Sequence, residues 1–525
     1  MPAFNLVKVF SAVAVVSYIV YAIISYVLTS RRNAAKARAL GCEEPLGREI
    51  AKLPLGIDLV QEFGKADQEK QIPPFMIKKF EELGNTYRFN LLGSTGFRTV
   101  EPKNIQAILA TQFEDFDLGE LRYKNFAPLL GHGIFTLDGQ GWKHSRAVLR
   151  PQFTRDQVSD LELEESHVQH MMKALDMQEV SNDWIEVDLL PYFFRLTLDS
   201  ATEFLIGEST NSQLAEQPGH QDQAIEGMSG AKFGKSFDAA LDGLAKRGRL
   251  MDFYWLHNPK EFRIANRQAH EFVDHYVNRA LTKWRNGEKL GGEGKYTFLD
   301  ALVMEIQDPI RLRHELLNIL LAGRDTTASH LGWVFHHLAC DPARFQKLRK
   351  SIIEDFGTYD RPHTQPTFAN LKECRYLRYV NDETLRLNPV VPLNSRRANK
   401  DTTIPVGGGP NGTSPIFVPK GTEVNYSVHA MHHRKDLWGQ DADEFNPERW
   451  EGRKPGWEYL PFNGGPRICI GQQFALTEAS YVIVRLLQRF DKIENLLPKD
   501  ELVQHNLNLT SCIGNGVKVK LHAAA

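Results

Sequence analysis

Residues 462–471 read FNGGPRICIG, and a helical pattern begins directly after them near Gln472. Glycines let the main chain approach a flat ligand and point amide N–H groups at the sulfur of Cys469. The N-terminus of the following helix adds positive potential that favours a thiolate over a thiol. A buried structural cysteine in a glycine-rich turn is the alternative, and for a lone cysteine it is the more common case. The residues around this cysteine favour instead a thiolate that ligates a metal.

The order of residues in this loop is specific. With average residue usage, Phe-x-x-Gly-x-Arg-x-Cys-x-Gly arises by chance in about one chain in ten thousand of this length. It is the signature of the cytochromes P450, and the chain matches it from Phe462 to Gly471, so the sequence resembles that family. The resemblance implies that Cys469 is the axial ligand of a haem iron, that Phe462 lies against the haem, and that Arg467 binds a haem carboxylate.

A second segment, residues 322–327 (AGRDTT), lies inside a long helical pattern and resembles the family's oxygen-binding segment. Gly323 allows the backbone to approach the haem, while the Asp325 carboxyl and the Thr326 hydroxyl can relay protons to bound dioxygen. A solvent-exposed polar turn is the alternative for so short a segment. Animal ω-hydroxylases that link haem through an ester carry Glu where this chain has Ala322, so we expect non-covalent haem b.

The segment Trp142-Lys143-His144-Ser145-Arg146 matches the family's Trp-x-x-x-Arg. Its two outer residues are one helical turn apart, so both can face the same haem propionate. Arg396, ten residues past Arg386, is similar to the family's third propionate partner, and the neighbouring Arg397 is the alternative.

Glu383 and Arg386 stand at positions i and i+3 of a predicted helix, where an ion pair can form. Most pairs at this spacing are solvated and contribute little. The family carries this Glu-x-x-Arg well before the cysteine and locks it to a Pro-Glu-Arg segment, here residues 447–449. The resemblance implies that Glu383, Arg386 and Arg449 are structural residues that hold the cysteine side of the haem pocket.

The composition is that of an ordinary globular protein with a large core, since 42% of the 525 residues are hydrophobic and 24% are charged. The net charge of −2 gives no basic field that would attract nucleic acid. The five cysteines lack the Cys-x-x-Cys spacing of zinc sites and dithiol pairs, which fits a reducing environment.

Helical spacing dominates the middle of the chain. Amphipathic patterns fill most of residues 103–356, and a last helical stretch runs from Gln472 to about Arg489. Residues 87–102 predict a β-hairpin, and short strands separated by Pro and Gly are expected after Arg386. The fold class is mainly α with small β-sheets (α+β), and the resemblance implies the cytochrome P450 fold.

The N-terminus predicts a membrane anchor. Residues 9–28 carry no charge over twenty positions, and four cations follow at Arg31, Arg32, Lys36 and Arg38. A cleaved signal peptide or a buried core helix are the alternatives. We expect an anchor over residues 1–32, a linker over 33–64 and the haem-thiolate monooxygenase domain over 65–525. The body then faces the cytosol, and the glycosylation patterns at Asn411, Asn425 and Asn508 stay unmodified.

Two other patterns are discounted. Residues 407–412 satisfy the dinucleotide pattern Gly-x-Gly-x-x-Gly, but Pro415 and Pro419 argue against the helix that the pattern requires. The histidines His429, His432 and His433 lack an acidic or cysteine partner in the sequence, so we expect no metal there. Because no nicotinamide or flavin motif is convincing, electrons have to come from another protein.

Longer stretches narrow the resemblance, among them GIFTLDGQGWKHSRAVLRPQF (residues 133–153) and DFYWLHNPKEFR (residues 252–263). They are similar to fungal n-alkane and fatty-acid hydroxylases of the endoplasmic reticulum. This branch implies insertion of one oxygen atom of O2 at the terminal carbon of a long apolar chain. Its partners would be NADPH-cytochrome P450 reductase, a b-type cytochrome as a further donor, membrane lipid and a hydrophobic substrate. An apolar channel is expected at Phe126, Leu129, Ile134, Phe135, Leu317, Leu320 and Leu321, which could equally be core.

Three other functions stay open at this point. The same chemistry can act on another hydrophobic metabolite. A reductase-independent isomerase or dehydratase of hydroperoxides is disfavoured by the intact Asp325-Thr326 pair and by the anchor. A haem-binding sensor or membrane scaffold would need neither a proton relay nor a substrate channel.

Overall fold

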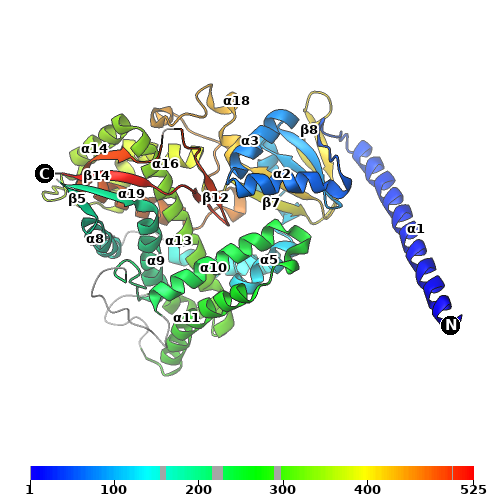
Figure 1. Ribbon diagram of the computed structural model, residues 1–525, viewed down its shortest axis with the longest axis horizontal. Helices are drawn as coiled ribbons and strands as arrows, with labels where there is room; N and C mark the ends of the chain where they lie inside the picture. The colour runs from blue at the N-terminus through cyan, green and yellow to red at the C-terminus, as the bar shows by residue number, and fades with distance from the viewer. Residues whose placement is uncertain are drawn as a thin grey trace.

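The computed structural model describes residues 2–153, 161–181, 183–215, 229–288, 297–498 and 500–524. Figure 1 shows a body in which long helices surround α13, with a smaller part rich in strands on the side nearest the N-terminal helix α1. The expected class, mainly α with small β-sheets, is confirmed. The α-helices are α1 (Pro2–Ala39), α2 (Ile57–Gln68), α3 (Ile72–Leu83), α4 (Pro102–Gln106), α5 (Glu120–Leu130), α6 (Gly139–Leu149), α8 (Glu162–Asp176), α9 (Leu189–Ile206), α10 (Gly230–Arg249), α11 (Lys260–Arg285), α12 (Phe298–Glu305), α13 (Pro309–Cys340), α14 (Pro342–Phe356), α15 (Phe368–Glu373), α16 (Arg375–Leu387), α17 (Val428–His432), α18 (Lys435–Trp438) and α19 (Gln472–Arg489).

Strands from both ends of the chain form the sheets. The six-stranded sheet has the order β1-β2-β3-β10-β7-β4, in which β2 and β3 form the predicted hairpin and β10 runs parallel to β3. A four-stranded sheet has the order β11-β14-β6-β5, and β12-β13 and β8-β9 are two-stranded. The strands are β1 (Gly47–Glu49), β2 (Thr86–Leu91), β3 (Ser94–Thr99), β4 (Phe116–Asp117), β5 (Glu179–Ser181), β6 (Trp184–Asp188), β7 (Leu393–Ala398), β8 (Thr402–Gly408), β9 (Ser414–Val418), β10 (Glu423–Ser427), β11 (Phe490–Asn495), β12 (His505–Leu507), β13 (Ser511–Ile513) and β14 (Lys518–Ala523).

The helix α13 is the central element of the body. Asp308 caps its N-terminus by accepting a hydrogen bond from the N–H of Ile310, and Pro309 stands at its first position, where no N–H is needed. Most of its side chains are buried, and these include polar residues such as Glu315, Asn318 and Asp325. It packs against α9, α11 and α19, so the segment 322–327 is held inside the protein.

The helix α19 matches its prediction, from Gln472 to Arg489. Its side chains from Thr477 to Gln488 are buried against α8, α13, α14 and α16. Because the loop 462–471 leads directly into this helix, the packing of α19 fixes where the loop lies.

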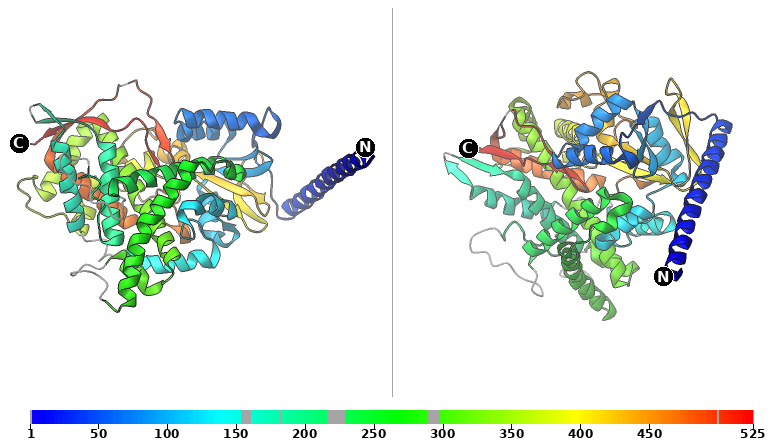
Figure 2. Two further views of the ribbon diagram at one scale, coloured as in Figure 1. Left: turned by 60° about the horizontal axis from the view of Figure 1, so that its bottom comes forward. Right: turned by 45° about the vertical axis from the view of Figure 1, so that its right-hand side comes forward.

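The N-terminal helix α1 projects from the body, as seen in Figure 1 and in the left-hand view of Figure 2. Its part Val13–Ala39 is long and apolar enough to cross a membrane, by length and composition, and none of its most apolar window is buried. The helix continues to Ala39, past the expected boundary at residue 32. There Lys36 Nζ lies 2.5 Å from a carboxylate oxygen of Asp401, which ties the end of α1 to the body.

The segment expected as a linker, residues 33–64, holds regular structure. It contains the end of α1, the strand β1 and the first part of α2. Gly47 makes β1 possible, because a Cβ there would lie 1.9 Å from the carbonyl oxygen of Leu83. Pro54 begins a short 3-10 turn that leads into α2. Helical structure therefore starts at this proline, inside the segment that was expected to be a linker.

The discounted glycine pattern at residues 407–412 lies in the turn between β8 and β9. Gly407, Gly409 and Gly412 all have positive φ angles, which explains why glycine stands there. As expected, no helix follows the last glycine; the strand β9 follows instead.

Candidate functional site

The cysteine loop is closed by its own backbone. The N–H of Cys469 donates to the carbonyl oxygen of Phe462 at 3.0 Å, and the N–H of Ile468 donates to that of Gly465 at 3.0 Å. Gly465 has φ +68°, and a Cβ there would lie 1.8 Å from the carbonyl oxygen of Leu109. Only glycine fits this position, so the loop is fixed in shape against the segment around Leu109.

The thiol of Cys469 faces a space that protein surrounds. The side chain itself is not covered by protein atoms, yet burial is the main cause that raises the pKa of its thiol. Both observations hold for a group that lines an interior hollow. A hydrogen bond from the N–H of Gly471 and the positive charge of Arg146 lower that pKa. These are the groups that would stabilise a thiolate when it ligates a metal.

The helix α6 brings both of its predicted residues to this loop. Arg146 donates from Nη1 to the carbonyl oxygen of Ile468 at 3.0 Å, directly before the cysteine. The buried Trp142 ring lies under the guanidinium of Arg467, 4.4 Å from centroid to Cζ. Arg467 also donates to the carbonyl oxygen of Leu137 and forms a 2.7 Å ion pair with Asp138. The structure therefore brings together Cys469, Trp142, Arg146 and Arg467.

Three arginines, Arg467, Arg396 and Arg122, lie close enough to repel one another, and Arg467 lies over the Trp142 ring. Burial lowers the pKa of Arg467 to about 10, and the positive charges of Arg396 and Arg122 contribute although Asp138 opposes them. Burial, and then Arg396, lowers the pKa of Arg122 to about 10. Arg396 is only 4% exposed and donates to the carbonyl oxygen of Ser395 at 2.7 Å. Like charges that repel one another in the protein interior indicate a site for an anion.

This cluster fits haem b, which carries two propionate carboxylates. Arg122 was not predicted, because no motif surrounds it in the sequence. It reaches the cluster from α5, where Nε donates to the carbonyl oxygen of Phe135 at 3.1 Å. A basic residue in the segment before Trp142 is the only hint that the sequence offers.

The helix α13 runs without interruption through the segment 322–327. Thr326 donates from its hydroxyl to the carbonyl oxygen of Ala322 at 2.6 Å. Burial raises the pKa of Asp325 to about 6, and the guanidinium of Arg324, 3.0 Å away, opposes the rise. Arg324 also pairs with Asp238 of α10, whose side chain is 57% exposed. Asp325, the acid of the predicted relay, is thus connected to solvent through Arg324 and Asp238, neither of which was predicted as a site residue.

Packing within the protein does not explain why residue 323 is a glycine. A Cβ at this position would meet only the Cβ of Ala201, at an ordinary 3.7 Å. Protein contacts therefore do not require glycine there. Its role in a close approach to a cofactor stays a prediction.

The residues predicted as structural form one buried network. Glu383 accepts two hydrogen bonds from Arg386, at 2.8 and 2.9 Å, and one from Arg449 at 3.3 Å. The indole N–H of Trp450 and the backbone N–H of Asn446 donate to the same carboxylate at 3.0 and 2.9 Å. All of these side-chain groups lie in the core, so the ion pair is not a solvated surface pair.

The same network reaches the cysteine loop through a histidine. His432 donates from Nδ1 to the carbonyl oxygen of Arg386 at 2.9 Å, and its Nε2 accepts from the N–H of Leu460 at 3.0 Å. Leu460 lies just before the loop 462–471. Both nitrogens of His432 thus have a structural use, and no group of metal-ligating residues is found in the described part of the chain.

Comparison with known proteins agrees with this geometry. The family model described as Cytochrome P450 matches residues 52–510. The chain belongs to the cytochrome P450 family. Similar proteins include Cytochrome P450 monooxygenase g430 of Fusarium sp, which is 60% identical over 96% of this chain and 89% of its own length. Cytochrome P450 monooxygenase alt2 of Alternaria solani is 44% identical over 96% of both chains, and Cytochrome P450 52A12 of Debaryomyces hansenii is 45% identical over 92% and 93%.

This P450 is therefore a monooxygenase that uses haem b, takes one oxygen atom from O2 and receives electrons from a redox partner. The 52A proteins from Debaryomyces and Candida confirm the resemblance to that fungal branch.

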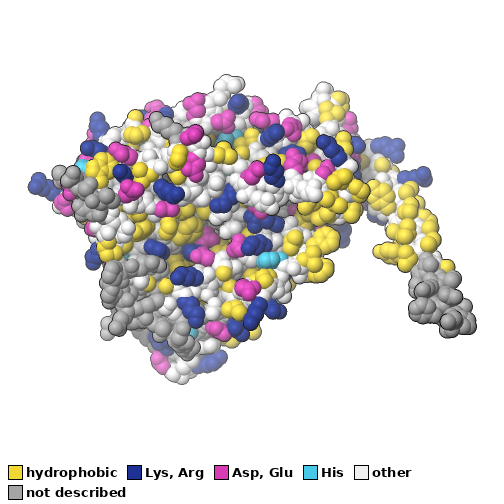
Figure 3. All heavy atoms as spheres, viewed as in Figure 1, with side chains coloured by type: hydrophobic (Ala, Val, Ile, Leu, Met, Phe, Trp, Pro, Cys, Tyr) yellow, Lys and Arg dark blue, Asp and Glu magenta, His cyan; other side chains and the backbone are white. Residues whose placement is uncertain are grey.

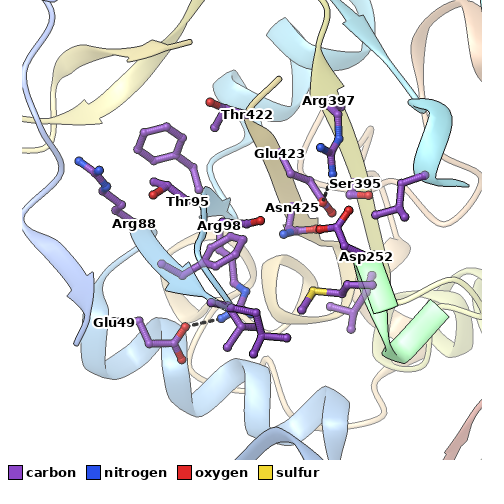
Figure 4. Close-up of a pocket in the computed structure, with 18 of the residues that line it drawn as sticks. Glu49, Arg88, Thr95, Arg98, Asp252, Ser395, Arg397, Thr422, Glu423 and Asn425 are labelled. Atoms are coloured by element: carbon purple, nitrogen blue, oxygen red, sulfur yellow. Dashed lines mark hydrogen bonds and ion pairs between the residues drawn. The ribbon is translucent and has the colours of Figure 1, made fainter. Parts of the chain in front are cut away.

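A large pocket of this P450, about 1070 Å³, lies between the six-stranded sheet, α2, α3 and the ends of α1 and α10. Its lining includes Arg122 and Tyr426, and the guanidinium of Arg396 lies 6.0 Å from the Tyr426 ring. The pocket thus extends from the surface to the arginine cluster. Figure 4 shows its charged side chains, among which Arg98 pairs with Glu49 at 2.6 Å.

Of the residues expected in an apolar channel, Phe126 lines this pocket. The others pack in the apolar core around α13, where Leu129 and Leu317 are fully buried. The alternative interpretation, that these residues are core, holds for most of them.

Proposed function

We propose that this P450 hydroxylates long-chain n-alkanes or fatty acids at the terminal carbon. The observation that carries the proposal is the pocket, because exposed apolar side chains such as Val60, Phe253 and Leu256 are part of its lining. A pocket that opens through apolar surface admits a water-insoluble chain directly from a membrane. The similarity to the 52A proteins supports the same substrate class.

Two segments supply this apolar surface, as Figure 3 shows over the start of α2 and below it. In the first, Leu55 is 65% exposed and Val60, which lines the pocket, is 40% exposed. In the second, a 3-10 helix (η5, Met251–Leu256) exposes Phe253 and Leu256, both of which line the pocket. Apolar side chains exposed on neighbouring segments indicate contact with a lipid surface.

Two of the arginines that line the pocket are paired with carboxylates. Arg98 is paired with Glu49, and Arg397 lies 3.2 Å from Glu423, as the close-up in Figure 4 shows. Cations already paired with carboxylates do not attract a second anion strongly. A pocket lined by paired charges is compatible with an uncharged alkyl chain. A polar end group of the substrate would stay at the entrance of the pocket.

The residues of the site have separate roles in the proposal. Haem b, when bound, supplies an iron that activates dioxygen. With haem bound, Cys469 would ligate its iron, and Phe462 and Gly323 would lie against its ring. The propionates would be held by the cations and the indole near the loop, namely Trp142, Arg146, Arg396, Arg467 and, in addition, Arg122.

The acid and alcohol on α13 handle protons in the proposal. Burial raises the pKa of Asp325 to about 6, so this carboxyl group can take up and release a proton close to neutral pH. The Thr326 hydroxyl passes a proton toward the oxygen site. The network of Glu383, Arg386 and Arg449 keeps the cysteine loop in place.

The proposed location is the endoplasmic reticulum membrane, with α1 spanning it once and the body in the cytosol. The cations that follow the apolar run support this orientation. Electrons come from NADPH-cytochrome P450 reductase, with a b-type cytochrome as a further donor. Asn411, Asn425 and Asn508 then remain without glycans.

The alternative is hydroxylation of another hydrophobic metabolite. The relative at 60% identity does not carry a 52A name, although it is more similar to this chain than the 52A proteins named above. A reductase-independent isomerase would have no use for the buried Asp325 beside Thr326.

Reconstitution with purified reductase and NADPH tests the proposal. We expect dodecane and lauric acid to be hydroxylated at the terminal carbon, as identified by mass spectrometry of the products. If neither is oxidised while other apolar compounds are, the alternative substrate class is correct and the substrate proposal is wrong. Turnover of a hydroperoxide without reductase would favour the isomerase.

A further inference from the structure

One buried arginine near the end of α10 holds three separate pieces of backbone. Arg247 is only 6% exposed. Its guanidinium donates to the carbonyl oxygens of Asn125 at 3.2 Å, Lys124 at 3.0 Å and His257 at 3.1 Å. Each of these three bonds goes to a backbone carbonyl and none to a carboxylate. Removing a cation from water is costly unless such acceptors compensate it, so these contacts fix where the side chain lies.

A proline explains why α5 offers a free acceptor to this arginine. Pro128 stands inside α5 and has no N–H. The carbonyl of Lys124, four residues earlier, therefore lacks its partner within the helix. Arg247 supplies the missing donor from Nη2, and its Nε bonds the neighbouring carbonyl of Asn125. The proline in α5 and the arginine in α10 are thus a matched pair.

The third contact of Arg247 reaches the segment between η5 and α11. His257, whose carbonyl oxygen accepts from Nη1, comes directly after η5. The Tyr254 ring of η5 lies 4.9 Å from the guanidinium carbon, and the Phe262 ring of α11 lies 5.8 Å from it. Cations are attracted to the faces of aromatic rings. One side chain therefore joins α5, α10 and the segment from η5 to α11.

The two segments that Arg247 joins both contribute to the wall of the large pocket. Arg247 is not itself part of the lining, so it lies behind this wall. The helices α5 and α10 pack against each other (Figure 1), and α5 also contacts η5. The lining residues from α5 are Leu121, Arg122 and Phe126, and those from η5 are Met251, Asp252, Phe253 and Leu256.

We propose that Arg247 is a positioning residue of the substrate pocket. By holding α5 at its proline against the end of η5, it fixes the place of Arg122 and Phe126 in the pocket wall. Loss of this contact lets α5 and η5 separate, so a bound substrate leaves more easily. The inference rests on the proposed function, in which the pocket admits the substrate.

The test compares Arg247→Met with a matched control, Lys246→Met. Lys246 is the preceding residue of α10, but its side chain is exposed, pairs with Asp242 at 2.7 Å and does not line the pocket. Both changes remove one cation from the same helix. The measurements are the dissociation rate of substrate, followed by the spectral change on binding, and kcat and KM separately. Any substrate that the wild type hydroxylates can be used, and haem retention is measured on the same samples.

We expect Arg247→Met to raise the dissociation rate and KM by about fivefold or more, while kcat changes by less than about twofold. Haem retention stays at the wild-type level. Arg247→Lys raises the dissociation rate and KM by a smaller factor, because one ammonium group does not span the carbonyls of α5 and His257. Lys246→Met behaves as wild type.

A second change tests the pairing with the proline. Pro128→Ala restores a backbone N–H that can satisfy the carbonyl of Lys124. Arg247→Met then raises the dissociation rate by a smaller factor in the Pro128→Ala background than in the wild type. Equal factors in the two backgrounds would overturn the proposal, because Arg247 would then act through general packing.

Asn425→Phe separates this inference from the proposed function. Asn425 lines the pocket from β10 (Figure 4), so a larger side chain there narrows the pocket and weakens substrate binding. If it does so while Arg247→Met keeps wild-type dissociation and KM, the role of Arg247 is wrong and the pocket assignment stands. If Asn425→Phe leaves binding unchanged, the pocket is not the substrate site and both proposals fail. Arg247→Lys decides alone if Arg247→Met does not fold.

Discussion

Replacing Glu383 with Gln tests how strongly the buried network holds the cysteine loop. The carboxylate accepts hydrogen bonds from Arg386, Arg449, Trp450 and the N–H of Asn446, and its side chain is fully buried. The amide keeps the shape of the carboxylate but removes the negative charge and turns one acceptor into a donor that faces donors.

The cost follows from the charges that remain. Arg386 keeps its backbone acceptors, the carbonyl oxygens of His432, Ala442 and Glu444, but loses its carboxylate partner in the core. Breaking one side of a buried ion pair costs about 3–5 kcal/mol. That is a large part of the roughly 5–15 kcal/mol by which proteins are stable.

The assay is urea unfolding, followed by far-ultraviolet circular dichroism, with haem retention measured on the same samples. The control is Glu354→Gln, which removes an exposed pair with Lys350 at 3.9 Å and costs about 0.5 kcal/mol or less. A loss below about 1 kcal/mol for Glu383→Gln, close to the control, would refute the structural role of the network.

Three further predictions concern protons and the cofactor. Thr326→Ala keeps haem but diverts reducing equivalents to peroxide, measured as peroxide per NADPH; tight coupling in this variant would contradict the relay. Arg122→Leu lowers haem retention at least as much as Arg396→Leu, judged by absorbance after gel filtration; unchanged retention would remove Arg122 from the propionate site. Burial lowers the pKa of His336 to about 3 and that of His433 and His505 to about 4, so the folded protein binds fewer protons than the unfolded chain below pH ~6.5. Unfolding free energy therefore falls from pH ~6.5 toward 4, and His336→Asn with His505→Asn flattens this loss; an unchanged slope would show that these histidines do not cause it.

Features that depend on neighbouring residues could be predicted from the sequence. The loop around Cys469, the helix α19 and the β2-β3 hairpin are each specified by glycines, capping positions and apolar spacing within a few residues. The ion pair of Glu383 and Arg386 is local as well, one turn apart on α16.

Features that arise only when distant segments meet could not be predicted. Arg122 reaches the arginine cluster because α5 folds back beside the cysteine loop, and the reason for Gly465 is a carbonyl oxygen at Leu109. Glu164 and Glu478 are both buried, although the sequence around each is that of an ordinary surface charge. Within residues 33–64, the strand β1 forms by pairing with β2. The sequence of so short a strand does not predict which strand it pairs with.

The carbon monoxide difference spectrum of the reduced protein tests thiolate ligation by Cys469 most directly, with wild type beside Cys469→Ala. We expect a strongly red-shifted Soret band in the wild type that is absent from the variant. A wild type that binds haem without this band, or a variant that keeps it, would contradict the assignment of Cys469.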